Sequence, residues 1–123
     1  MQVSKQDVSK SIEKKIFKSL YQVIADLKKP NEVEKFLEDV LSETERTVLA
    51  KRLGIAYYLS KNKSYEAIRQ DLKVSSATIA SVQKWLEKGG EGLQLAIKTI
   101  EADEWAGEMA EKVSLSLKKV FKR

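Results

Sequence analysis

The stretch from Ser64 to Gly89, SYEAIRQDLKVSSATIASVQKWLEKG, constrains the fold more than any other part of the chain. Its apolar residues recur three and four positions apart on two short segments, and residues at these separations share one face of a helix. Serines stand where N-caps are needed, Ser64 before the first helix and Ser75 or Ser76 before the second. Gly89 and Gly90 follow the second helix, where a left-handed backbone is favourable for glycine. The pattern predicts two packed helices joined by a tight turn, burying Ile68, Leu72, Val74, Ile79 and Val82.

This arrangement is typical of a helix-turn-helix, whose second helix presents its outer face to the major groove of DNA. An ordinary helical hairpin that reads nothing would share the apolar pattern, but the pattern together with both caps favours the DNA-reading interpretation. The predicted reading face is small and rich in hydroxyl groups, and it has no arginine for a bidentate guanine contact. Water-bridged contacts and packing against thymine methyl groups are therefore expected. This face consists of Ser75, Ser76, Ala77, Ala80, Ser81 and Lys84, with Thr78 and Gln83 on its flanks.

Basic residues surround the predicted reading face, and most of the affinity is expected from their contacts with phosphates. Binding should therefore depend strongly on salt and show a modest sequence preference. Lys73 falls in the turn, where glycine is favoured because the backbone is left-handed, and lysine there costs ~1 kcal/mol or more. Trp85 is interpreted as a packed aromatic that closes the helix-turn-helix core, with base stacking as the alternative. The candidate phosphate contacts are Lys61, Lys63, Arg69, Lys73, Lys84 and Lys88.

The chain before this stretch is also predicted to be helical. Apolar residues recur at helical spacing over residues 12–27, with lysines on the opposite face. Pro30 is expected to stop this helix, and Asn31 to begin the next. Ser42 and Glu45 form an S-x-x-E pattern, which predicts a capping box at the start of a third helix. Three helices are therefore expected ahead of the helix-turn-helix.

The third helix is predicted over residues 44–61 and contains Gly54 in its interior. A mid-helix glycine costs ~1 kcal/mol relative to alanine, so its presence indicates a close helix crossing. After Gly92 a sixth helix is expected, and residues 101–123 should form a C-terminal helical extension that either continues it or forms an extra helix. The chain is thus expected to be all-α, with residues 1–100 forming one domain. The third helix is expected to bury Val48, Leu49, Leu53, Ala56 and Tyr57.

Composition limits the function classes open to this chain of 123 residues. Cysteine and histidine are both absent, which excludes disulfides, thiolate metal sites and the commonest general base. No cluster of carboxylates replaces them, so neither an enzyme nor a metal site is expected. No signal peptide or apolar run of membrane-spanning length is evident, and a cytoplasmic location without membrane contact is expected. The net charge of +5 favours a polyanionic partner.

Two arguments predict a homodimer. Short helices with broad apolar stripes leave apolar surface facing outward, and pairing two chains would bury it. In addition, one helix in one major groove contacts few bases, so DNA readers of this kind usually span two half-sites about one DNA turn apart.

The segment from Leu41 to Lys98 resembles the Trp repressor superfamily, in particular its YerC/YecD-type branch. Three pieces carry the resemblance: LSETERTVLAKRL, SYEAIRQDLKVSSATIASV and a GGEGL ending. Ala77, Thr78 and Ile79 match the start of the family's recognition helix. The resemblance implies a six-helix, intertwined homodimer that binds operator double-stranded DNA as a transcriptional regulator, most simply a repressor.

The resemblance also bears on the effector. In tryptophan-binding members of the family, two arginines clamp the indole of the corepressor. Arg52 matches the first position, Ser81 stands at the second, and Ser42 replaces a threonine near the ligand. Serine can neither stack on an indole nor supply a guanidinium, so half of the clamp is missing and no tryptophan cofactor is expected. Arg52 is interpreted instead as an ion-pair partner of Glu45 or Glu66.

The alternative function is a helical protein–protein adaptor that does not use its helix-turn-helix on DNA. An acidic partner would explain the positive charge equally well. Such an adaptor should carry large apolar residues on the face that would otherwise read DNA, and the sequence predicts none there.

Overall fold

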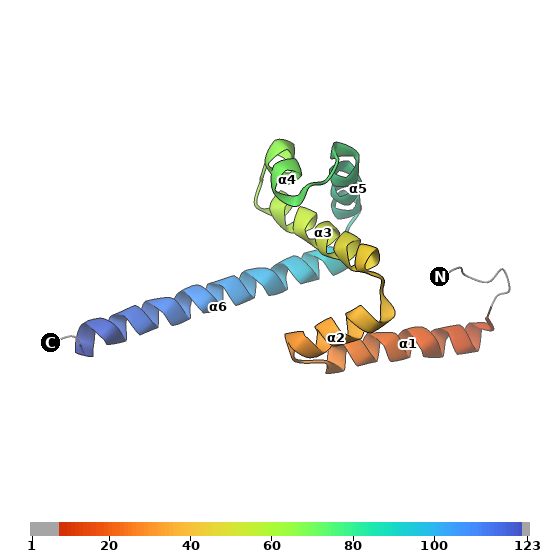
Figure 1. The fold of residues 1–123 in the computed structure, drawn as a ribbon, viewed down its shortest axis with the longest axis horizontal. Helices are drawn as coiled ribbons and strands as arrows, with labels where there is room; N and C mark the ends of the chain where they lie inside the picture. Colours follow the sequence, from red (N-terminus) through yellow and green to blue (C-terminus); the bar gives the residue numbers. More distant parts are fainter. Residues whose placement is uncertain (1–7, 122–123) are drawn as a thin grey trace. The chain divides into compact units, whose positions relative to one another are not determined.

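The computed structural model describes residues 8–121, and every regular element in this range is a helix (Figure 1). The all-α prediction is therefore confirmed. The chain divides into two compact units, residues 1–46 and residues 47–123, which are described separately. The helices in chain order are α1 (Lys10–Asp26), α2 (Pro30–Val40), α3 (Glu43–Ser60), α4 (Tyr65–Leu72), α5 (Ser76–Glu87) and α6 (Glu91–Phe121).

Helix α1 of the first unit has a broad apolar face that no other described part of that unit covers. The Oγ atom of Ser9 accepts a hydrogen bond from the amide of Ile12 at 3.4 Å and caps the helix. No side chain of α1 is buried. Its exposed apolar residues are Ile12, Ile16, Phe17, Leu20, Tyr21, Val23 and Ile24. A helix with so much exposed apolar surface needs another surface against which to pack.

Helix α2 begins one residue earlier than the sequence predicts. Pro30 is its first residue and Lys29 its N-cap, with no side-chain capping bond, so the expectation that Asn31 begins this helix is wrong. The physical reason is that proline is well suited to the first helical position, where no intrahelical N–H partner is needed. Helix α1 has already ended at Asp26, and Leu27 is its C-cap.

The capping box at the start of α3 is confirmed in full. The amide of Glu45 donates to the Oγ atom of Ser42 at 3.1 Å, and the amide of Ser42 donates to the Oε1 atom of Glu45 at 2.7 Å. Hydrogen bonding from Ser42, chiefly from its backbone amide, lowers the pKa of the Glu45 carboxyl, because it favours the ionised form. Arg46 lies 3.9 Å from Glu38 and adds an ion pair beside the box.

The core of the second unit joins α3, α4, α5 and the start of α6. Gly54 lies against α4, and a Cβ atom added to it would stand 3.2 Å from the Cδ1 atom of Leu72. This confirms the predicted close crossing. Leu72 and Val74 pack against the core while partly exposed. The fully or nearly fully buried side chains are Ile55, Ala56, Ile68, Ile79, Val82 and Ile97.

Helix α3 buries a different set of residues from the one predicted. Ala56 is buried as expected and Tyr57 is partly buried, but Val48, Leu49 and Leu53 are exposed to solvent. Ile55 takes the central place instead. The helical period was predicted correctly, but α3 carries apolar residues around much of its circumference, so spacing alone does not say which of them face the core.

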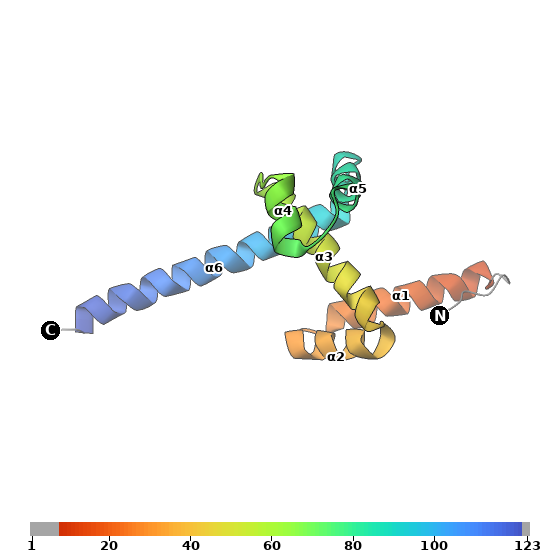
Figure 2. The same ribbon diagram turned by 45° about the horizontal axis from the view of Figure 1, so that its top comes forward.

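The sixth helix is one continuous element of 31 residues, Glu91–Phe121. The C-terminal extension therefore continues α6 and does not form a separate, extra helix. In Figures 1 and 2, the later turns of α6 run away from α4 and α5. The hydroxyl of Tyr57 on α3 donates to Glu104, which raises the pKa of Tyr57 to about 12. No helix among the described residues is both long enough and apolar enough to cross a membrane.

Candidate nucleic-acid interface

The helical hairpin of α4 and α5 has the caps and the turn that the sequence predicts. The Oγ atom of Ser64 accepts from the amide of Ala67 at 3.1 Å, and the Oγ atom of Ser75 accepts from the amide of Thr78 at 3.2 Å. Ser75, and not Ser76, is therefore the N-cap of α5. Between the helices, Lys73 has a left-handed backbone with φ 54° and ψ 55°.

Three contacts from outside the turn hold this hairpin in place. The Nζ atom of Lys51 on α3 donates to the carbonyl oxygen of Lys73 at 3.2 Å. The hydroxyl of Tyr58 on α3 donates to Asp71 at 2.9 Å, and this bond to a carboxylate raises the pKa of Tyr58. The hydroxyl of Tyr65 donates to Gln83 and joins α4 to α5. The second helix of the hairpin is thus fixed relative to α3 and α4.

The outer face of α5 is open to solvent. Ile79 and Val82 are fully buried on its inner side, so the opposite side faces outward. Ala80 is partly buried and stands at the edge of the face. The hydroxyl of Ser81 donates to the carbonyl oxygen of Ala77 at 3.1 Å, which leaves its lone pairs free to accept. The exposed members of the predicted face are Ser75, Ser76, Ala77, Ser81 and Lys84, and Thr78 on its flank is exposed as well.

The first turn of α5 has amide groups available to an anion. An α-helix leaves its first N–H groups without intrahelical partners, and its dipole places partial positive charge at that end. Ser75 caps the amide of Thr78, and its Oγ atom also shares a 2.9 Å hydrogen bond with the Thr78 hydroxyl. The amides of Ser76 and Ala77 remain at the exposed helix start. Ser75 therefore serves first as a cap, and a phosphate would meet its two neighbours.

The predicted cations around the hairpin are exposed and lack carboxylate partners within 4.0 Å among the residues that the structure describes. Nearby carboxylates are engaged elsewhere: Asp71 accepts from Tyr58, and Glu87 accepts from Gln83 at 3.2 Å. Lys61 is the exception, because it lies 3.7 Å from Glu101 on α6. It is therefore a poor candidate for a phosphate contact. The cations that fit the prediction are Lys63, Arg69, Lys73, Lys84 and Lys88.

Trp85 and Arg52 form a pair that the sequence did not predict. Trp85 is 43% exposed, so it does not close the helix-turn-helix core as expected. The guanidinium carbon of Arg52 on α3 lies 5.5 Å from the centroid of the Trp85 ring, within range of a cation–π interaction. Neither Glu45 nor Glu66 forms an ion pair with Arg52 within the described part of the chain, so that interpretation of Arg52 is wrong.

The three candidate effector residues have other roles in this structure. Arg52 stacks on Trp85, Ser81 bonds to the backbone of its own helix, and Ser42 is part of the capping box of the first unit. An indole group is thus already present on Arg52, and it comes from the chain itself.

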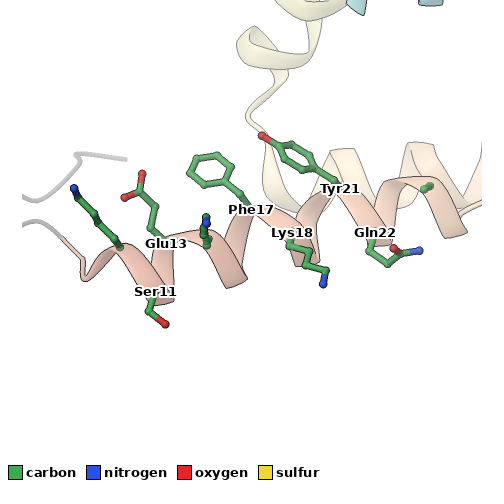
Figure 3. Close-up of a pocket in the computed structure, with 9 residues that line it drawn as sticks. Ser11, Glu13, Phe17, Lys18, Tyr21 and Gln22 are labelled. Carbon is green, nitrogen blue, oxygen red and sulfur yellow. The ribbon is translucent and has the colours of Figure 1, made fainter.

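A shallow pocket runs along α1 in the first unit, on a different helix from the predicted reading face of α5. All nine residues that line it belong to this one helix, so no second element forms an opposite wall. Figure 3 shows Phe17 and Tyr21 projecting from the same stretch of helix as Glu13 and Lys18. The two rings are 6.0 Å apart. The pocket therefore lies at the edge of the exposed apolar face of α1, where Phe17 and Tyr21 adjoin polar side chains, and none of the candidate site residues lines it.

Comparison with known proteins fits this geometry. The family described as Trp repressor protein matches residues 15–101, which include the whole hairpin. The chain belongs to the Trp repressor family. The uncharacterized protein YerC of Bacillus subtilis strain 168 is 29% identical over 85 residues, which cover 69% of this chain and 82% of YerC.

A crystal structure of a Staphylococcus aureus protein, described as a candidate Trp repressor, has the same fold. It superposes with a TM-score of 0.67 at 26% identity, covering 76% of this chain and 96% of that one. This chain is therefore a YerC-type, Trp-repressor-like protein, from a family of regulators rather than enzymes.

Sequence reasoning missed the contacts that orient the hairpin in this Trp repressor family member. The Lys51–Lys73, Tyr58–Asp71 and Tyr65–Gln83 hydrogen bonds join residues that are 22, 13 and 18 positions apart. A capping box can be predicted from a serine and a glutamate three residues apart, but no fixed sequence spacing identifies these three hydrogen-bonded pairs. The available signal was the presence of one tyrosine shortly before the predicted hairpin and one inside it, Tyr58 and Tyr65.

Proposed function

We propose that this protein is a DNA-binding transcriptional regulator, most simply a repressor, in which α5 enters the major groove. The observation that carries the proposal is the exposed outer face of α5, small and rich in hydroxyl groups, on a hairpin held to α3 by specific contacts. Family membership supports the same conclusion. A small face allows the helix to approach base edges closely, and the N-terminal residues of such a helix usually make the base contacts.

Phosphate contacts supply most of the affinity in this proposal. Five exposed cations without carboxylate partners in the described part of the chain lie along the hairpin, from Lys63 before α4 to Lys88 after α5, and the open amides of Ser76 and Ala77 lie at the start of α5. Because each neutralised phosphate releases counterions, binding weakens steeply as salt rises. The absence of an arginine on the face leaves a modest sequence preference.

The regulator acts as a homodimer in the cytoplasm. Helix α1 buries none of its side chains, and Val48, Leu49 and Leu53 of α3 are also exposed. Exposed apolar faces of this extent support burial against a second copy, and a twofold dimer would present two copies of α5 to two half-sites. Sedimentation of the purified protein tests this part: a dimer is expected, and a monomer at micromolar concentration would contradict it.

The test of DNA binding is fluorescence anisotropy with random and selection-enriched duplexes across a salt series. Lys84→Ala should weaken binding to all duplexes and reduce the salt slope by about one per subunit. Ser76→Ala should reduce the preference for the enriched duplex. Lys35→Ala, an exposed lysine of α2, is the matched control and should change neither. If Lys84→Ala and Ser76→Ala both bind as the unmodified protein does, α5 is not the reading element.

Tryptophan is not required for binding in this proposal. Ser81 supplies no guanidinium, and Arg52 already stacks on the ring of Trp85. Affinity for DNA should therefore be the same with and without added tryptophan. A failure to bind any duplex at low salt would favour the adaptor function.

A further inference from the structure

The C-terminal part of α6 lies beyond the family match, which ends at residue 101. We call residues 101–123 the extension. Apolar side chains follow each other at intervals of four along it, so they form one ridge on the helix surface. All of them are 40–64% exposed. The residues of this ridge are Trp105, Met109, Val113 and Leu117.

Charge is divided sharply along the extension. Residues 101–111 contain five carboxylates and no basic side chain, and residues 112–123 contain five basic side chains and no carboxylate. The sign changes between Glu111 and Lys112. The ridge from Trp105 to Leu117 has its midpoint at Glu111 as well, so the apolar pattern and the charge pattern share one centre.

Charges beside the ridge are arranged symmetrically about Ala110, one residue before the midpoint of the ridge. Glu101, Glu108, Lys112 and Lys119 are separated by seven, four and seven residues, and they therefore share one flank of the helix. Two such helices side by side and antiparallel would bring Glu108 of each opposite Lys112 of the other. Glu101, which also contacts Lys61 in its own chain at 3.7 Å, would come opposite Lys119.

We infer that the extension is a self-association surface that pairs antiparallel with the extension of a second copy of this chain. A parallel pair would place carboxylates against carboxylates and lysines against lysines, which is unfavourable. An antiparallel pair places opposite charges together and covers both apolar ridges. The surface gives the protein a contact between copies that is separate from the DNA-reading hairpin, and it does not depend on the function proposed above.

Thiol cross-linking of the full chain without DNA tests this inference, because the protein has no cysteine of its own. Ala110→Cys lies at the centre of the extension and should give a covalent dimer with a short bismaleimide. Ala102→Cys, a matched exposed alanine of the same helix, should not. In an antiparallel pair, the two copies of residue 102 are about 25 Å apart, at 1.5 Å of rise per residue.

Charge reversal in the Ala110→Cys background tests the role of the charges. Lys112→Glu and Glu108→Lys, each made alone, should each abolish the cross-linked dimer, and mixing the two reversed proteins should restore it. Circular dichroism controls for helix content. Equal cross-linking at 102 and 110, no cross-linking at 110, or unchanged cross-linking after reversal would each overturn the inference.

Discussion

Replacing Lys73 with glycine should make the protein more stable and, at the same time, a weaker DNA binder. Lys73 has φ 54° and ψ 55°, and a left-handed backbone costs an L-residue about 1–2 kcal/mol. Glycine removes this strain but loses about 0.5–1 kcal/mol through the greater freedom of the unfolded chain. The net expectation is a gain of about 0.5–1 kcal/mol in the free energy of unfolding. The bond from Lys51 is kept, because its acceptor is the backbone oxygen.

Urea unfolding and DNA anisotropy together check this prediction. Lys73→Ala is the matched control, since it removes the cation but keeps the strained backbone. It should lose DNA affinity to the same extent as the glycine variant without gaining stability. Asn62→Gly provides a second control: Asn62 has φ 59°, but asparagine tolerates this conformation, so its gain should be smaller. If the glycine variant of Lys73 is no more stable than the alanine variant, left-handed strain at this turn is not a real cost.

Four other perturbations test the fold. Ser42→Ala should lower the free energy of unfolding by about 1 kcal/mol by removing the cap, measured by thermal denaturation. The lowered pKa of Glu45 means that its ionised carboxyl stabilises the folded state above the ordinary pKa of 4.5, and this stabilisation should fade as the pH falls below that value. The readout is the loss of helicity in acid, which Glu45→Gln should reduce. The pKa of Tyr57 is raised to about 12, so the contribution of its hydrogen bond to the free energy of unfolding is complete below pH 10 and is lost as the pH rises through 12. Glu104→Gln should lower this pKa, as measured by a tyrosinate absorbance titration. Arg52→Ala, made with Trp105→Phe, should shift Trp85 emission to the red and lower the free energy of unfolding by about 0.5–1 kcal/mol, whereas unchanged emission would contradict the stacked pair.

The features that the sequence predicted correctly are governed by residues close together in the chain. The capping box of Ser42 and Glu45 and the cap of Ser64 each join residues three apart. Gly54 indicated that another helix packs against α3 at this point, because glycine inside a helix carries a cost that packing must offset. The buried residues of α4 and α5 followed from helical spacing on two short amphipathic segments.

The features that the sequence did not reveal depend on residues far apart. No residue near Trp85 in the sequence indicated that Arg52, 33 positions earlier, would form a cation–π contact with its ring at the surface. Val48, Leu49 and Leu53 fit a buried helical stripe as well as Ile55 does, and only the placement of α4 and α5 decides between them. The residues of the DNA-reading face could be named from the sequence, and their role in binding stays a prediction.

The core of the second unit also has a kinetic consequence. All of its buried side chains lie between Ile55 and Ile97, and the helices that carry them follow one another directly in the chain. Few residues separate the surfaces that must meet, so little loop entropy is lost before packing begins. Helical domains with such local contacts fold in microseconds to milliseconds. The hairpin of α4 and α5 should therefore form early and quickly in folding.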